Sequence, residues 1–182
     1  MNKNYGTIEE LIKNELANEE EPKTVELMKK LSGVKEKGYC DQAEFMDICM
    51  WKSARPKRHY LENTEEEIIR VTKEAFATKF EKRKMELLTG LKGVSIPTAS
   101  AILTLTDPES YGVIDIRVWQ ILHLYNSVKD NPKGIGFDFE NWYNYLMKLR
   151  YYAKKFNAKA RDIERTIFYH HRKIQEGNLY NS

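Results

Sequence analysis

The chain has 182 residues, of which 41% are hydrophobic and 31% charged, so it can bury a sizeable core as a globular protein. No run approaches the roughly 18 consecutive apolar residues that a membrane span needs, and no apolar signal segment follows the N-terminus. This composition excludes a membrane-spanning protein and predicts a cytoplasmic one with no membrane partner.

Apolar residues recur at intervals of three and four along almost the whole chain, a pattern that predicts an all-α fold without paired strands. Capping-box spacings mark three helix starts: Thr7 with Glu10, Asp41 with Glu44, and Thr64 with Glu67. In chain order, the expected helices cover residues 7–18, 23–31, 41–53, 64–80, 81–90, 97–106, 116–126, 138–157 and 160–175. In the fourth of these, an apolar stripe from Ile68 to Phe80 indicates a buried face.

Two parts of the chain are expected: an N-terminal helical extension at residues 1–36 and a compact multi-helix domain at residues 37–182. The acidic run at residues 19–22 could leave the first helix loosely held. Three apolar side chains could instead dock this helix on the main domain: Leu11, Ile12 and Leu16. The sequence leaves both arrangements open, and it does not indicate an oligomeric state.

The net charge of +3 is unevenly distributed along the chain. Residues 1–22 hold two basic and six acidic side chains, whereas residues 144–173 hold nine basic and two acidic ones. A basic cluster of this kind favours a polyanionic partner, although a solvated helix surface is the alternative. On the final helix, Arg161 and Arg165 are the candidates for phosphate contacts.

Cysteine and histidine offer no obvious metal site. Cys40 and Cys49 are the only cysteines, too few for a disulfide framework or for a four-cysteine iron–sulfur cluster. The adjacent His170 and His171 would point to different sides of a helix, which favours a surface or interface role over metal binding. We therefore expect no bound metal centre and no required cofactor.

The most informative segment lies between two expected helices near residue 93. Gly93 permits a tight backbone turn, and Pro97 suits the start of a helix because it has no N–H to leave unpaired. Free amides at the start of such a helix form a natural site for a phosphate. The residues predicted to contact the DNA backbone here are Lys92, Gly93, Val94, Ser95 and Ile96.

Together with Asp115, this segment resembles the helix-hairpin-helix (HhH-GPD) superfamily of DNA glycosylases. Gly93, Val94, Ala99 and Asp115 match the family pattern, over a block of about residues 85–124. The resemblance implies a glycosylase-like fold and double-stranded DNA as partner. It also permits a monovalent cation held by hairpin carbonyls.

Two positions depart from the family pattern. Ser95 replaces the usual second glycine of the hairpin, and Pro97 stands where family members with lyase activity carry their Schiff-base lysine. By this comparison the chain does not use lysine chemistry at that position. A glycosylase of this kind would be monofunctional, cleaving only the bond between base and sugar.

Asp115 is the central candidate for catalysis. Breaking an N-glycosidic bond builds positive charge on the sugar, which a fixed carboxylate can stabilise while it orients a water molecule. The alternative is a purely structural role, because Asp is among the best residues for capping the helix that follows. Both roles can hold at once.

A second group of candidates lies at the end of the helix expected at 41–53. Lys52 shares the helical phase of apolar residues and could act as a nucleophile, or it could simply extend its amine to water. Trp51 and Trp119 could stack on a base extruded from the duplex, or belong to the core.

The sequence therefore predicts an all-α helix-hairpin-helix domain that acts in base-excision repair as a monofunctional DNA N-glycosylase. A non-catalytic helix-hairpin-helix module that only binds DNA is the first alternative. A protein-interaction domain, whose basic helix meets an acidic partner, is the second.

Overall fold

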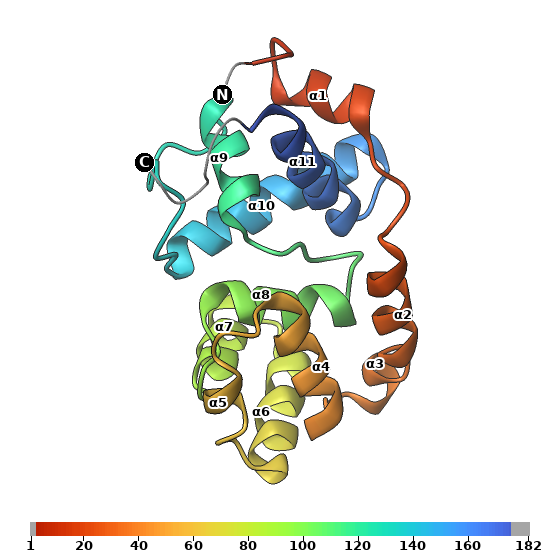
Figure 1. The fold of residues 1–182 in the computed structure, drawn as a ribbon, viewed down its shortest axis with the longest axis vertical. Helices are drawn as coiled ribbons and strands as arrows, with labels where there is room; N and C mark the ends of the chain where they lie inside the picture. The colour runs from red at the N-terminus through yellow and green to blue at the C-terminus, as the bar shows by residue number, and fades with distance from the viewer. Residues whose placement is uncertain (1–2, 176–182) are drawn as a thin grey trace.

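The computed structural model describes residues 3–175, which form eleven α-helices and no strand. Figure 1 shows most of them in two groups, one above the other. The lower group holds α4 (Gln42–Lys52), α5 (Lys57–Tyr60), α6 (Glu65–Ala77), α7 (Glu81–Thr89) and α8 (Ile96–Thr106). The upper group holds α1 (Ile8–Glu15), α9 (Ile116–Leu124), α10 (Phe139–Phe156) and α11 (Ala160–Ile174). Along one edge, α2 (Pro22–Lys30) and α3 (Val34–Lys37) link the two groups.

The all-α class is confirmed, and the three expected caps form. The hydroxyls of Thr7 and Thr64 accept hydrogen bonds from the amides three residues later, at 3.1 and 3.3 Å. Asp41 and Glu44 cap each other's amides reciprocally, both at 2.9 Å. None of the helices in the described range is long and apolar enough to cross a membrane.

The expected helix ends differ from the observed ones by at most three residues. The largest correction concerns Phe80, which was expected on a buried stripe but is 76% exposed. The helix α6 ends at Ala77, because the chain becomes extended at Thr78 and the Lys84 ammonium donates to the carbonyls of Ala75 and Thr78. Two short helices, α3 and α5, lie in segments expected to be loops.

The N-terminal helix docks on the last helix. Leu11 and Ile12 of α1 are fully buried in the core, and α1 packs against α11. Beyond α1, the amide of Ala17 donates to the hydroxyl of Thr166 at 2.9 Å, and Arg165 donates to the carbonyl of Ala17 at 2.6 Å. Apolar burial and hydrogen bonds therefore hold this segment to α11 in place of the loose arrangement.

The segment before α9 runs between the two groups and is fixed by both (Figure 1). From below, the hydroxyl of Ser100 on α8 accepts a hydrogen bond from the amide of Ile114 at 3.1 Å. From above, the hydroxyl of Tyr145 on α10 donates to the carbonyl of Val113 at 2.8 Å. Asp115, the next residue, is therefore held in position from two sides.

Candidate functional site

The turn between α7 and α8 is closely packed around Gly93. Its φ of +81° is one that residues with a side chain rarely adopt, and a Cβ atom there would lie 2.9 Å from the ring of Tyr60. Asn63 holds the neighbouring residue: it accepts from the Lys92 amide at 2.8 Å and donates to the Lys92 carbonyl at 3.1 Å. The hairpin is thus supported by α5 and the loop after it.

The hairpin offers some of its predicted contact residues to solvent and buries another. Lys92 and Ser95 are exposed, whereas Val94 is 7% exposed and faces the core. The helix α8 begins at Ile96, where the first amides have no partner within the helix. Among the described residues, no hydrogen bond uses the amides of Gly93 or Ser95, so this surface can receive an anion.

Asp115 caps α9 and also binds a lysine from the lower group. Its carboxylate accepts from the amide of Arg117 at 3.0 Å and from the ammonium of Lys52 at 2.9 Å. The Asp115 side chain is 24% exposed and that of Lys52 is 15% exposed, so the pair is largely shielded from water. The capping role is therefore present, and the carboxylate still reaches solvent.

The protonation state of Asp115 follows from these neighbours. Burial by itself raises the pKa of this carboxyl, but the Lys52 ammonium and the hydrogen bond from Arg117 outweigh burial and leave the pKa below its usual value. Asp115 is consequently a carboxylate at neutral pH. A fixed negative charge of this kind can stabilise a cation that forms beside it.

Two cavities meet at Asp115. The first has a volume of about 310 Å³, near the lower limit for small-ligand sites, and its walls include Trp51, Lys52, Asp115, Glu164, Phe168 and Tyr169. The second has a volume of about 380 Å³ and includes Ser95, Ile96, Pro97, Asp115 and Ile135. Asp115 thus lies between an aromatic and charged cavity on one side and the hairpin groove on the other.

Trp51 contributes one wall of the first cavity, as expected for a residue that could stack on a base. Its indole N–H donates to the hydroxyl of Thr24 at 3.1 Å, and the guanidinium of Arg161 lies 5.6 Å from its ring centre. Trp119 does not line this cavity. It is 1% exposed and donates to the carbonyl of Asn131 at 2.8 Å, which makes it a core residue.

The two arginines predicted to contact phosphate line the first cavity and not the hairpin groove. Arg161 and Arg165 are 7% and 3% exposed, and they pair with Glu20, Asp162 and Glu164 in one buried cluster. Their guanidiniums are therefore paired with carboxylates of the protein itself. The periodicity of α11 showed on which face of the helix these arginines lie. It did not show that the acidic segment containing Glu20 covers that face.

His170 and His171 correct a further expectation, because both are fully buried and not on a surface. His170 lies 3.0 Å from the carboxylate of Glu15, and His171 lies 2.9 Å from the side-chain oxygen of Gln120. Within residues 3–175, no group of three or more His, Cys, Asp or Glu side chains could hold a metal ion.

Glu164 is a site residue that sequence reasoning missed. It lies on the buried face of α11, 3% exposed, with the buried residues Ala160 and Ile167 one turn to either side. A carboxyl group on the apolar face of a helix was the available signal, since buried carboxyls need a partner or a function. Phe168 and Tyr169 follow on the same helix and carried no such signal.

No protein-family model matches this chain, and neither a curated protein nor a solved structure matches it. Function must therefore be argued from the chemistry of the site. The relevant facts are a shielded carboxylate, the cavity and groove that it separates, and a glycine turn with free amides beside them.

Proposed function

We propose that this protein is a DNA N-glycosylase, which hydrolyses the bond between a base and its deoxyribose. The observation that carries this proposal is the position of Asp115, which lines both the first cavity and the hairpin groove. The phosphate, sugar and base of a nucleotide extruded from a duplex follow one another in space. A protein that binds such a nucleotide therefore needs a phosphate site, a place for the sugar and a base pocket along one path. The two cavities supply the ends of such a path.

In this proposal, the DNA backbone lies against the hairpin, where the amides of Gly93 and Ser95 and the ammonium of Lys92 face the phosphates. The base enters the first cavity beside Trp51. The bond between base and sugar then lies next to Asp115. These contacts do not depend on the base sequence of the DNA, as expected for an enzyme that searches a duplex for single bases.

Catalysis in this arrangement is electrostatic. As the base departs, the sugar becomes cationic, and the Asp115 carboxylate stabilises that charge and orients the attacking water. Lys52 keeps Asp115 ionised and in position through their ion pair. Because Pro97 replaces the lysine that bifunctional family members use, we propose hydrolysis without strand cleavage.

A panel of duplexes containing alkylated, oxidised or deaminated bases tests this function. Alkaline treatment after incubation should reveal strand breaks at one or more of the modified bases, and no breaks should form without alkali. Salt-sensitive binding without any abasic site would favour the non-catalytic DNA-binding module. The ion pair fits this alternative, because Lys52 neutralises the charge of the Asp115 carboxylate. Absence of both binding and base release would exclude both proposals.

A further inference from the structure

The helix α10 carries large apolar side chains on two faces. One face packs into the core through six buried residues: Trp142, Tyr145, Leu146, Leu149, Tyr152 and Ala153. On the other side, four apolar residues follow one another at every fourth position and form what we call the apolar row: Phe139, Tyr143, Met147 and Tyr151. The last three of these are 37%, 36% and 54% exposed. Residues four apart lie one above another on a helix, so the apolar row is continuous along the outer side of α10.

The apolar row is ordered and lies apart from the proposed catalytic site. The rings of Phe139 and Tyr143 stack on each other, with their centres 5.5 Å apart. None of the four residues lines either of the cavities that meet at Asp115. Single apolar side chains are common on a protein surface, but a contiguous exposed set marks a site of interaction. The apolar row therefore indicates a docking surface that the proposed function does not use.

Two opposite charges flank the centre of the apolar row at equal distances. Glu140 and Lys154 are both exposed, and each lies seven positions from Met147. They are about 21 Å apart along the helix axis, at about 1.5 Å per residue, so they cannot pair within one chain. None of the ion pairs within residues 3–175 involves either side chain. Both charges are therefore free to meet a partner.

This arrangement of charges is complementary to itself. When two copies of a helix pack antiparallel about a two-fold axis beside Met147, each residue faces the one at the same distance on the other side of Met147 in the second copy. Met147 then meets its own counterpart, and Tyr143 meets Tyr151 of the second copy. Glu140 meets Lys154 of the second copy, and this pair forms twice. The two apolar rows, each with a spacing of four, can interdigitate as helix ridges do.

We propose that the outer side of α10 is the interface of a homodimer, in which the apolar row of one copy packs antiparallel on the apolar row of a second copy. A polyanion fits this face less well, because Glu140 would repel it. A surface with one sign of charge would satisfy only one end of the face, whereas a second copy satisfies both. One pair of helices is small beside the roughly 1,200–2,000 Å² that stable complexes bury, so we expect reversible association at micromolar concentrations.

Cysteine cross-linking tests the register of this dimer. Met147→Cys should form a disulfide-linked dimer under mild oxidation, because residue 147 approaches its own counterpart across the axis. Tyr143→Cys and Tyr151→Cys should each remain monomeric alone but link to each other when they are mixed. The two native cysteines are buried and take no part. Lys73→Cys is the matched control and should link far more slowly, since residue 73 is exposed on α6 in the other group of helices (Figure 1).

Charge reversal tests the same register at equilibrium. Glu140→Lys places two lysines opposite each other at both ends of the interface, and it should raise the dissociation constant of the dimer on the order of tenfold or more. Lys154→Glu should have the same effect, and the variant that carries both changes should regain the wild-type constant. Glu66→Lys reverses an exposed charge on α6 and should leave the constant unchanged. Sedimentation equilibrium measures all four variants.

A wild-type protein that remains monomeric at millimolar concentration overturns the dimer, and so does Met147→Cys that links no faster than Lys73→Cys. Linking of Tyr143→Cys with itself would indicate a different register and overturn the antiparallel arrangement. Weaker DNA binding by Tyr151→Ala, with a monomeric wild type, would assign the apolar row to nucleic acid instead. None of these measurements uses base release, so the inference stands or falls independently of the proposed function.

Discussion

Asp115 joins two duties in one side chain, because the same carboxylate caps α9 and faces both cavities. Asn caps a helix about as well as Asp, but it has no charge to oppose a cationic sugar. Substitution at this residue therefore separates the structural duty from the proposed chemical one.

We expect Asp115→Asn to reduce base release on the order of a hundredfold or more while DNA binding holds or improves. Loss of the partner of Lys52 should lower the free energy of unfolding by roughly 1–3 kcal/mol. Thermal unfolding and single-turnover kinetics measure both effects. Asp138→Asn is the control, because Asp138 caps α10 in the same way but is exposed and lines neither cavity. Full activity in Asp115→Asn would leave Asp115 as a cap alone.

Lys52 lies close enough to Asp115 to raise the question of a covalent mechanism. The amine donates a hydrogen bond to the Asp115 carboxylate at 2.9 Å, so attack on a sugar aldehyde would require this ion pair to break. Borohydride added to the protein and an abasic duplex should therefore trap no covalent adduct, as seen by denaturing electrophoresis. An adduct that disappears in Lys52→Ala, but not in Lys92→Ala, would make Lys52 the nucleophile.

At the residue scale, the sequence identified those residues of the cavity wall whose positions follow from local sequence patterns. Trp51, Lys52 and Asp115 come together because each stands at a helix end, where a motif or a breaker is visible in the chain. Glu164 was missed, and the pairing of Arg161 with Glu20 could not be predicted, because it joins residues 141 positions apart in the chain.

Elements pack closely at the hairpin between α7 and α8, where a Cβ atom at residue 93 would lie 2.9 Å from the Tyr60 ring. Gly93→Val would place a branched side chain at a φ of +81° and against Tyr60. We expect a loss of roughly 2–5 kcal/mol in the free energy of unfolding, from backbone strain and overpacking together, and weaker DNA binding. Gly33→Val provides the comparison, since a Cβ there meets nothing within 4 Å. Equal unfolding free energies for the two variants, measured by denaturant titration, would contradict the packing described for the hairpin.

The helix α11 carries a buried histidine, His171, whose protonation opposes folding. Burial, with the nearby charge of Arg117, lowers the pKa of His171 from 6.5 to about 4. The unfolded chain therefore binds the proton first, and stability present above pH 6.5 is lost as the pH falls towards 4, by about 1.4 kcal/mol per pH unit.

Denaturant titrations across this pH range should show a smaller loss for His171→Gln than for the wild type. His59→Gln, at an exposed histidine, should follow the wild type. Identical pH slopes for His171→Gln and the wild type would exclude a neutral His171 in the folded state.

The positions of the helices were easier to predict from the sequence than the contacts of single residues. Helix starts depend on caps that lie within four residues, so the sequence contains them in full. Helix ends depend on tertiary partners: Lys84 closes the end of α6 from the next helix, and no local pattern of α6 indicated that interaction.

At the scale of the whole molecule, the acidic and basic ends of the uneven charge distribution pair with each other. Four carboxylates of the acidic N-terminal region pair with basic side chains of the last two helices: Glu9 with Lys155, Glu15 with Lys173, Glu20 with Arg161 and Arg165, and Glu21 with Arg172. Five of the nine basic side chains at residues 144–173 are therefore paired with the N-terminal region. Their charge holds the N-terminal segment in place.

One basic surface lies beside the hairpin. None of the ion pairs in the described residues involves Arg55, Lys57 or Arg58, which precede or begin α5 and are exposed. DNA affinity should fall steeply between about 50 and 200 mM salt, and replacing these three residues by Gln should reduce the slope by roughly 0.9 for each phosphate that is no longer neutralised.

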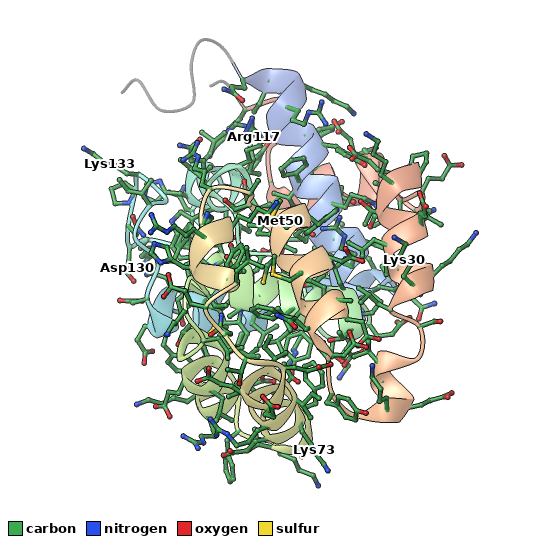
Figure 2. The ribbon with its side chains drawn as sticks, turned by 60° about the horizontal axis from the view of Figure 1, so that its bottom comes forward. Lys30, Met50, Lys73, Arg117, Asp130 and Lys133 are labelled. Atoms are coloured by element: carbon green, nitrogen blue, oxygen red, sulfur yellow. The ribbon has the colours of Figure 1, made fainter. Side chains whose placement is uncertain are left out.

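Fluorescence titrations at several salt concentrations measure this slope. The control replaces Lys73, Lys79 and Lys82 by Gln, near the end of α6 and the start of α7. Figure 2 shows Lys73 at the opposite end of the molecule from Arg117, which lies just after Asp115. Salt-independent affinity, or equal effects of the two triple variants, would remove the hairpin as the docking surface.

The docking of α1 on α11 also sets an order of assembly during synthesis. The helices α4 to α8 pack on one another within residues 42–106, so the ribosome can release them as a nearly complete unit. Leu11 and Ile12 emerge before these helices but remain unburied until α11 has been made. The hairpin therefore forms early, whereas the cavity beside Asp115 closes only when α11 packs against the N-terminal segment. A nascent chain halted before α11 would carry a finished turn and an unprotected apolar helix, which makes it a target for chaperones and proteases.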